Sequence, residues 1–437
     1  MSASKREELR KLWMKREELL AKFFSPEGKP SALEGVKVVE ISPHPVGAMV
    51  GGLLRELGAE VVRVEPPAGD PLREISPYGV KIKDVGIFYL VENAGKKIVH
   101  LDLEREDDRE ALRGLLLSCD VVIDGLKPGY LDSIDLGYRS ISSKNPKVIY
   151  LAISSYGHFS KKAKEMANVP DSDLTAQAYN GYPSLLGNPK IRPLPLRAGI
   201  WAAWVMATAC ALTGALLALY ERLKSGKGQF VDIATHEALA AMTVTPMVAG
   251  YLFGISRPQY GFIDYMGYPF GVYRTKDGYA TIATPFDPDF RAFLKLIKRW
   301  DLEPDWRYAI DRMADDLDRI LELHKEIDKE LRRYTVEELI RRSLRRGLLP
   351  EFIRRFTGRP VIVKAYTLRE VVNEKHWYVR QSLLKIKVNE KEILVPNSPF
   401  KMSETPGRIP VEKMFTQEFL TKEALVAMAS RSEAKSK

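Results

Sequence analysis

Short apolar runs alternate with helical patterns along the first part of the chain. From Leu33 onward, "VKVVEIS" and "AEVVRVE" predict strands, and "VGAMVGGLLREL" between them predicts a helix. The same alternation continues through "KKIVHLDLE", "DREALRGLLLS", "DVVIDGL" and "KVIYLAIS". Strands rich in Val and Ile that are separated by helices are typical of a parallel sheet covered on both faces. The pattern therefore predicts an α/β domain.

The middle of the chain has a different pattern. The segment "YPFGVYRTKDGYATIAT" predicts an antiparallel hairpin with Asp277 and Gly278 at the turn, and amphipathic helices follow from about Asp289 to Leu349. Beyond them the pattern is mixed again. We expect an N-terminal helical extension at residues 1–30, a large domain at 31–225 completed by 371–437, and a smaller α+β domain at 226–370.

One stretch, Gly199 to Tyr220, carries no charge and is flanked by basic residues. As a helix rising about 1.5 Å per residue it would be long enough to cross a bilayer. Ala and Thr dominate it, however, and it lies alone in the middle of the chain. This composition favours a helix packed inside a large core over a membrane span.

Composition narrows the class of protein. Hydrophobic residues make up 45% of the chain and charged residues 28%, as in globular proteins. The N-terminus lacks the pattern of a signal peptide, and two cysteines, Cys119 and Cys210, suit a reducing cytoplasm. The net charge is +10, but the basic residues are interspersed with nearly as many acidic ones. This pattern favours an anionic small ligand over nucleic acid. Abundant Lys, Arg and Glu are typical of a thermophilic source.

Several common functional motifs are not found in the sequence. Gly47, Gly51 and Gly52 do not form the G-x-G-x-x-G pattern of dinucleotide binding, and we expect them to let the helix lie close to the sheet. The six histidines lack the close spacing of metal ligands, so no metal site is expected. No G-x-S-x-G elbow or Walker loop is present.

Three polar residues occupy positions of interest. Asp173, in "PDSDLTAQAYNG", stands just before a predicted helix and is expected to cap it. Lys96 and Lys127 follow strands or turns of the predicted parallel sheet, where ligands of such folds collect. Each lysine taken alone is also compatible with an ordinary surface position.

In combination, these segments resemble the family III CoA-transferases, which include formyl-CoA and carnitine CoA-transferases, benzylsuccinate CoA-transferase and the α-methylacyl-CoA racemases. The resemblance rests on the family order of "LEGVKVVEIS", "LGAEVVRVEPPAGDPLR", "ENAGKKIVHLDLE", "DVVIDGLKPGYLDSIDLGY", "NPKVIYLAISSYG", "DLTAQAYNGYPSLLG", "SGKGQFVDIATHEAL" and "YPFGVYRTKDGY". It implies a Rossmann-like large domain, a small domain from the middle of the chain, and ring-shaped chains that interlock as a dimer. The helix before "SGKGQ" would lie inside the protein, with no membrane involved.

The resemblance also implies coenzyme A as a substrate and no permanently bound cofactor. The family's CoA contacts fall here on seven residues of the large domain: Pro45, Val46, Asn93, Lys96, Leu126, Lys127 and Tyr156. Lys96 and Lys127 would neutralise nucleotide phosphates. The family often has an Arg in the helix after "PG", where this chain has Ser133 or a neighbour, so CoA binding is expected to be weaker or rearranged.

A larger departure concerns the catalytic carboxylate. The resemblance implies an Asp at the start of the helix in "RAGIWAAWVMAT", but alignment places Trp204 or Gly199 there, and no acid lies between Asp173 and Glu221. That carboxylate would attack an acyl-CoA thioester to give a mixed anhydride and then an enzyme-bound thioester. The racemase His-Asp pair is similarly replaced by Ser172 and Asp173.

Three hypotheses follow. The chain is the CoA-binding subunit of a heteromer whose homologous partner supplies the nucleophile. Alternatively, it is an autonomous transferase or racemase, as a homodimer, that uses Asp173 as nucleophile or base. The third hypothesis is an acyl-CoA-binding protein without catalytic activity. The transfer would move CoA from an acyl-CoA such as succinyl-CoA to an organic acid that the sequence does not identify.

Overall fold

The computed structural model describes the chain except for residues 1–6, 8–10, 12–14, 20, 77–78, 171, 189–193, 255–258, 262–266, 309–311, 313–315, 348–357, 389–390 and 436–437. Much of the predicted N-terminal helix lies outside the described residues. The chain divides into two compact units. Unit 1 comprises residues 1–180, 199–244 and 375–437, and unit 2 comprises residues 181–198 and 245–374.

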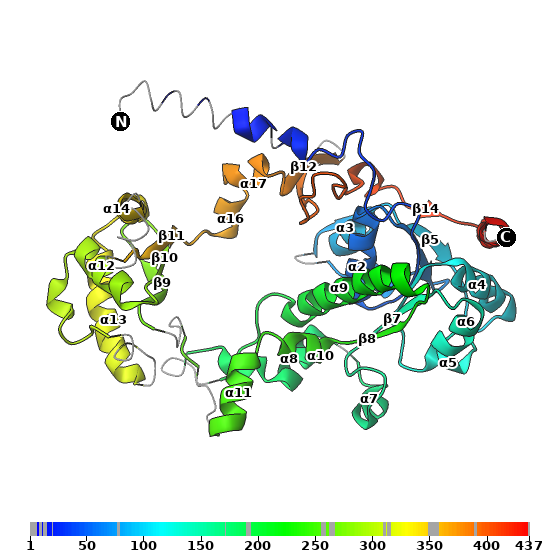
Figure 1. Cartoon of the computed structure of the whole chain (residues 1–437), viewed down its shortest axis with the longest axis horizontal. Coiled ribbons are helices and arrows are strands. Elements are labelled where there is room, and N and C mark those ends of the chain that lie inside the picture. Colours follow the sequence, from blue (N-terminus) through cyan, green and yellow to red (C-terminus); the bar gives the residue numbers. More distant parts are fainter. Residues whose placement is uncertain are drawn as a thin grey trace. The chain divides into compact units, whose positions relative to one another are not determined.

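A seven-stranded sheet forms the centre of unit 1 (Figure 1). Its strand order is β14-β5-β2-β1-β6-β7-β8, and every neighbouring pair is parallel. The strands are β1 (Lys37–Ile41), β2 (Glu60–Glu65), β5 (Lys97–His100), β6 (Val121–Asp124), β7 (Ile149–Ser154), β8 (Phe230–Ala234) and β14 (Glu418–Phe419). The central strands are buried on both faces, which explains their continuous apolar sequences.

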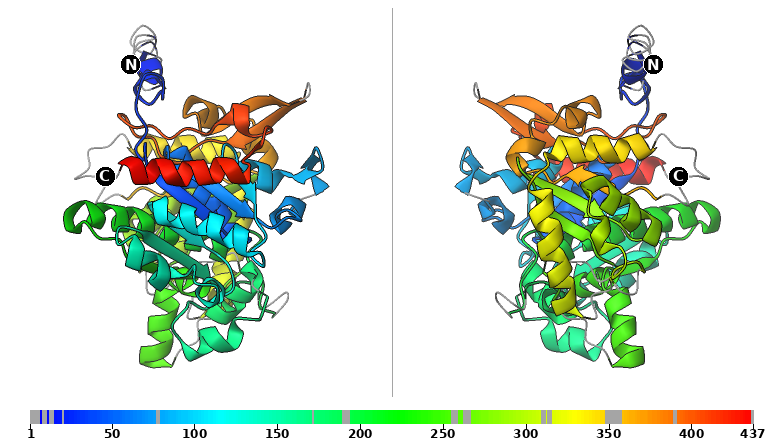
Figure 2. Two further views of the ribbon diagram at one scale, coloured as in Figure 1. Left: turned by 90° about the vertical axis from the view of Figure 1, so that its right-hand side faces the viewer. Right: turned by 90° about the vertical axis from the view of Figure 1, so that its left-hand side faces the viewer.

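Helices cover both faces of this sheet. On one face, α2 (Pro45–Glu56) and α9 (Ala202–Ser225) share a core with side chains such as Val38, Ile123 and Leu151. On the other face, α4 (Glu106–Ser118) and α18 (Lys422–Lys435) pack together over a second core, as Figure 2 shows for α18. The Rossmann-like α/β arrangement predicted from the sequence is confirmed for the large domain.

Helix α9 contains most of the uncharged stretch. Among the described residues, α9 is the one helix whose length and apolar composition would allow it to cross a membrane. Ala203, Ala207, Ala211 and Ala215, four residues apart, are all fully buried. They form one stripe that lies against α2 and the sheet, since small side chains allow close approach. In this structure α9 is therefore a core helix of unit 1.

The remaining elements of unit 1 connect or flank these layers. They are η1 (Pro71–Glu74), β3 (Lys81–Ile82), β4 (Val85–Gly86), α3 (Ile87–Glu92), α5 (Tyr130–Ser133), α6 (Tyr138–Lys144), α7 (Lys161–Met166), α8 (Asp173–Asn180), α10 (Thr235–Ala240), α17 (Lys375–Val379), β12 (Leu383–Val388), β13 (Lys391–Pro396) and η6 (Val411–Lys413). The β12–β13 hairpin packs on α3 through a small apolar cluster that includes Leu90 and Val395.

Unit 2 has its own core. A three-stranded sheet, β11-β10-β9, packs with three helices through buried residues such as Tyr273, Phe293 and Ile327. The predicted hairpin is β9 (Phe270–Arg274) and β10 (Tyr279–Ala283), which pair antiparallel. The other elements are η3 (Tyr182–Leu185), α11 (Val244–Phe253), α12 (Asp287–Ile297), η4 (Trp300–Leu302), α13 (Leu317–Leu331), α14 (Val336–Gly347), β11 (Val361–Lys364) and α16 (Leu368–Val371).

The two units differ from the expected domains in their boundaries. Residues 226–244 were placed in the small domain, but β8 pairs with β7 and extends the large sheet. Residues 181–198 were placed in the large domain and instead group with unit 2. The turn after α9 therefore leads the chain back to the sheet before it enters unit 2.

Candidate active site

The large sheet reverses its strand order at β1. From β1 the chain proceeds outward through β2 and β5 on one side, and then through β6, β7 and β8 on the other. In open parallel sheets, ligands bind outside the carboxyl ends of the strands at such a reversal, because the connecting loops separate there. The loops that follow Ile41 and Asp124 therefore define the candidate site.

Two cavities lie at this edge of the sheet. A cavity of about 150 Å³ is lined by His44, by residues 125–128 after β6 and by residues 153–157 around the end of β7. A second, of about 330 Å³, is lined by residues that follow β1, β2 and β5, and by Tyr130. Leu126 lines both cavities. We refer to them together as the crevice.

His44 organises the start of α2 beside the crevice. Its Nδ1 atom accepts a hydrogen bond from the backbone N–H of Val46 at 3.1 Å, and Pro45 begins the helix. Pro45 and Val46, both predicted to contact CoA, are buried and line neither cavity. His44 was not among the predicted contacts, although its position directly after a strand was a usable signal.

Asp124 holds the loop that contains Leu126 and Lys127. One carboxylate oxygen accepts from the backbone N–H of Leu126 at 3.0 Å, and the other accepts from the hydroxyl of Tyr150 at 3.1 Å. Burial raises the pKa of Asp124 to about 6. Lys127 is exposed beside the crevice, where its ammonium is free to approach a phosphate.

Tyr156 lines the crevice from the end of β7. Its ring packs against those of Tyr179 and His236, with centroid distances of 5.0 and 5.3 Å. The Nδ1 atom of His236 lies 2.6 Å from the carbonyl oxygen of Ser155 and thereby fixes the ring cluster. The structure thus brings Leu126, Lys127 and Tyr156 together at one cavity.

Asn93 and Lys96 lie elsewhere, in the interior. The Lys96 ammonium donates to Glu40 Oε2 at 2.8 Å, to the carbonyl oxygen of Ala48 at 2.7 Å and to Asn93 Oδ1 at 2.8 Å. An ammonium has three donors, so all are used. Burial lowers the pKa of Lys96 well below its usual value. The expectation that Lys96 neutralises a phosphate does not fit this arrangement, because its partners are internal.

Asp173 lies at the start of α9. It is the first residue of α8, but one carboxylate oxygen accepts hydrogen bonds from the backbone N–H groups of Ala203 at 2.9 Å and Trp204 at 3.2 Å. Gln177 donates to its other oxygen at 2.5 Å, and the residue is 3% exposed. The expectation that Asp173 caps its own helix is corrected: the Ser172 hydroxyl accepts from the Thr175 N–H there.

Trp204 contacts this carboxylate through its backbone N–H and contacts His44, at the crevice, through its ring. Its ring is 5.9 Å from that of His44, and its indole Nε1 is buried without a hydrogen-bond partner among the described residues. Gly199 precedes the helix. Neither Trp204 nor Gly199 has an acidic side chain, and the carboxylate that lies at the start of α9 is that of Asp173. The sequence offers Asp173 as an alternative nucleophile, but its contact with the start of α9 depends on tertiary packing and has no local sequence signal.

Within the described residues, no three or more His, Cys, Asp or Glu side chains are grouped so as to hold a metal ion.

Comparison with known proteins identifies the family. The model of CoA-transferase family III matches residues 33–413. A succinyl-CoA–D-citramalate CoA-transferase from Chloroflexus aurantiacus is 29% identical over 88% of this chain and 91% of its own length. The BbsE subunit of succinyl-CoA:(R)-benzylsuccinate CoA-transferase from Thauera aromatica is 36% identical over 47% of this chain and 48% of its own.

A solved structure shares the fold. The crystal structure of a CAIB/BAIF family protein from Brucella suis covers 92% of this chain and 100% of its own, with a TM-score of 0.72 and 24% identity. Because the family model spans most of the sequence and the strand reversal forms the expected crevice, the chain belongs to CoA-transferase family III.

Proposed function

We propose that the chain is a CoA-transferase in which Asp173 is the nucleophile. The observation that carries this proposal is the position of the Asp173 carboxylate at the N-terminus of α9, bonded to the Ala203 and Trp204 N–H groups. The family resemblance requires a carboxylate at this helix start, and the stretch itself has none. Asp173 provides one from the neighbouring helix.

The environment of Asp173 suits a carboxylate that must be ionised to react. The partial positive charge of a helix N-terminus stabilises an anion, and the two N–H groups fix its orientation. The carboxylate attacks the thioester carbonyl, and CoA leaves as the thiolate, which gives a mixed anhydride. The thiolate then attacks the Asp173 carbonyl and releases the first acid. The second acid accepts CoA by the reverse steps, and Asp173 is regenerated.

The names of the relatives suggest the substrates. Both the citramalate and the benzylsuccinate enzymes are named for succinyl-CoA as donor and for a dicarboxylic acid as acceptor. We propose the same pair of classes for this chain. A second carboxylate on each acid would match the positive charge that the exposed Lys127 brings to the crevice.

The test is transfer from succinyl-CoA by the purified chain. Asp173→Asn should lower kcat by a factor of about 10³ or more, because the amide cannot attack while its oxygen still accepts the helix N–H bonds. Asp107→Asn, an exposed first-turn acid of α4, is the matched control and should have wild-type activity. Intact mass spectrometry after incubation with succinyl-CoA should show a CoA adduct in the wild type and none in Asp173→Asn. Full activity of Asp173→Asn would contradict the proposal.

A second candidate function is that of the non-nucleophilic, CoA-binding subunit in a heteromer. It is favoured by the burial of Asp173, whose two oxygens both have partners, and by the subunit status of BbsE. In that case Asp173 only stabilises α9, and a homologous chain supplies the nucleophile. The purified chain alone would then be inactive and would gain activity from the partner, and Asp173→Asn would leave that activity unchanged.

A further inference from the structure

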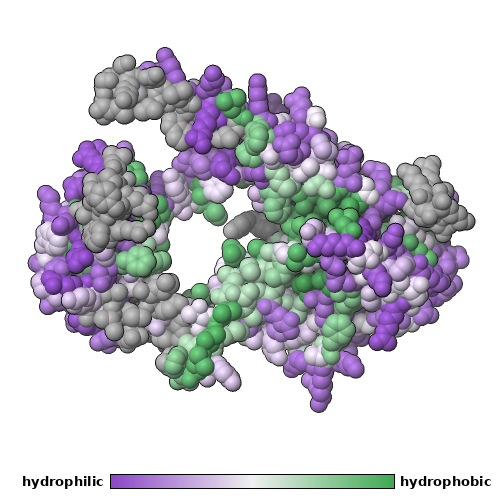
Figure 3. All heavy atoms as spheres, in the orientation of Figure 1, coloured by the Kyte–Doolittle hydropathy of each residue, from purple (hydrophilic) through white to green (hydrophobic). Residues whose placement is uncertain are grey.

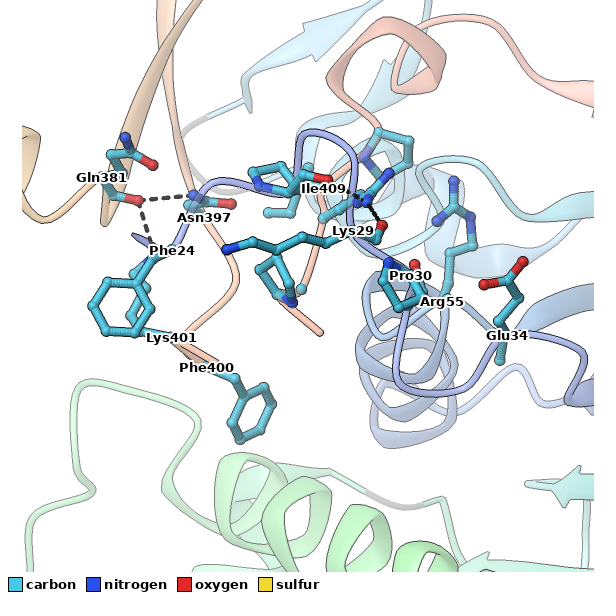
Figure 4. Close-up of a pocket in the computed structure, with 18 of the residues that line it drawn as sticks. Phe24, Lys29, Pro30, Glu34, Arg55, Gln381, Asn397, Phe400, Lys401 and Ile409 are labelled. Atoms are coloured by element: carbon cyan, nitrogen blue, oxygen red, sulfur yellow. Dashed lines mark hydrogen bonds between the residues drawn. The ribbon is translucent and has the colours of Figure 1, made fainter. Parts of the chain in front are cut away.

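A large pocket lies at the opposite end of α2 from the crevice. Its volume is about 790 Å³, and Figure 4 shows how its side chains converge. Residues 24–34, the C-terminal end of α2 and residues 381–413 form its walls, all within unit 1. Helix α2 has twelve residues and so separates the pocket from the crevice by about 18 Å.

Four half-buried cations surround this pocket: Lys29, Arg55, Lys401 and Arg408. We refer to it as the basic pocket. Their hydrogen bonds go to backbone carbonyls. Lys29 donates to Ser403 at 2.7 Å, Lys401 to Ser398 at 3.1 Å and Gln381 at 3.2 Å, and Arg55 to Gly95 at 3.1 Å. Arg408 donates to the carbonyls of Pro26 and Lys29.

Carbonyl dipoles do not neutralise these four charges. Among the described residues none of the four forms an ion pair, and the acids that line the pocket, Glu34 and Glu412, are exposed. Burial lowers the pKa of both Arg55 and Lys401, which shows that desolvation outweighs the opposing effect of nearby acids. An anion in the pocket would compensate the cations.

Two further features indicate the kind of anion. The Nε atom of Arg408 is buried without a hydrogen-bond partner among the described residues, so a donor is unused. Phe24 and Phe400 contribute aromatic rings to the lining (Figure 4). The volume falls in the upper part of the range for small-molecule sites and far exceeds the needs of an inorganic anion or a small dicarboxylate.

We propose that the basic pocket binds a nucleotide, with its phosphates among the cations and its planar base against the aromatic rings. Several cations call for a ligand with more than one negative charge, and aromatic rings provide a stacking surface for a base. This site is distinct from the crevice and does not depend on whether Asp173 is the nucleophile. The ADP portion of CoA has the same chemistry, so the test must separate the two sites.

The experiment is isothermal titration of the full chain with ADP. Lys401→Gln and Arg55→Gln should each weaken ADP binding by about tenfold or more, since each removes a charged partner. Lys144→Gln, an exposed lysine at the end of α6, is the matched control and should leave binding unchanged. Circular dichroism of each variant verifies that the fold is retained. Arg408 is left intact because both of its carbonyl partners, those of Pro26 and Lys29, lie in the N-terminal segment that forms one wall of the pocket.

The position of binding is decided by a second set of titrations. Lys127→Gln, at the crevice, should weaken CoA binding and leave ADP binding at the basic pocket intact. If ADP binding instead falls with Lys127→Gln and not with Lys401→Gln, the nucleotide occupies the crevice and the proposal is overturned. Absence of ADP binding at millimolar concentration overturns it too, as does inorganic phosphate or succinate binding as tightly as ADP.

Discussion

Arg63 connects three buried acids in the interior of unit 1. Its guanidinium contacts Glu40, Asp70 and Glu65, and none of these side chains is more than 4% exposed. Glu40 also accepts from the buried Lys96. Each charge therefore depends on the others for compensation, because water is excluded.

Replacement of Arg63 by Met should lower the free energy of unfolding by about 3–5 kcal/mol, because three acids lose their shared cation. Urea denaturation measures the loss. The control is Lys97→Met, which removes a partly exposed pair between Lys97 of β5 and Glu60 of β2 and should cost less than about 1 kcal/mol. Equal losses of unfolding free energy in the two variants would show that the buried network contributes no more to stability than the partly exposed pair.

Glu56, at the end of α2, should make stability depend on pH. Burial raises its pKa from 4.5 to about 7, with Glu92 adding repulsion and Arg55 and Lys401 opposing the shift. The folded state therefore holds a proton that the unfolded state has lost, and stability falls as the pH rises from about 4.5 to about 7. Glu56→Gln should be more stable than the wild type at pH 8 and similar to it near pH 5. Urea midpoints at both pH values test this, and a wild type at least as stable as the variant at pH 8 would contradict it.

Single residues show how far the sequence predicts the site. Leu126, Lys127 and Tyr156 could be placed at the crevice because each follows a strand whose end the pattern locates. Lys96 also follows a turn of the sheet, but its ammonium points inward to Glu40, a contact 56 residues away in the chain. Asp173 could not be assigned to α9, because its partner N–H groups lie 30 and 31 residues further on. Such contacts depend on tertiary packing.

At the scale of elements, α2 lies close to β1 because glycine faces the sheet. A Cβ atom added to Gly51 would overlap Glu40 Oε2 and lie 3.0 Å from Lys96 Nζ. The sequence-based expectation that these glycines permit close packing is confirmed at this position. The strands and the hairpin were also predictable, since their patterns are local; the parallel pairing of β14 with β5 joins residues more than 300 positions apart and has no local signal.

Gly51→Ala should therefore destabilise the protein by about 1–3 kcal/mol, although alanine normally favours a helix, because the added methyl group displaces the buried ion pairs. Thermal unfolding measures this effect. Gly199→Ala, where an added Cβ meets nothing within 4 Å, should be neutral. A rise in thermal stability for Gly51→Ala would show that the helix can move away from the sheet at little cost.

At the scale of the whole molecule, helix α11 exposes apolar side chains, and we expect it to contact a second chain. Tyr251 is 90% exposed, Phe253 71% and Leu252 61%, and the helix forms an apolar surface in Figure 3. Water-exposed apolar patches of this kind commonly mark protein interfaces. The family resemblance makes a second copy, as a dimer, the expected occupant.

Tyr251→Asp and Leu252→Asp should each convert a dimer into a monomer, because a charge in an apolar interface is costly to bury. Native mass from light scattering gives the result. Leu368→Asp changes another exposed leucine, which is 81% exposed on the four-residue helix α16, and should leave the dimer intact. Persistence of the dimer in both α11 variants would place the interface elsewhere.

The large sheet is closed at its edge by the C-terminal end of the chain. β14 pairs with β5, the backbone N–H of Leu420 donates to the carbonyl oxygen of Ile98 at 2.7 Å, and Leu425 of α18 is fully buried. On the ribosome, the continuous segment 245–374 of unit 2 emerges before these residues do. Unit 2 can thus fold first. At usual rates of synthesis, β14 is made about tens of seconds after β5, so this edge of β5 stays unpaired for that time. During that interval the growing polypeptide exposes an unpaired strand edge, to which another chain can pair.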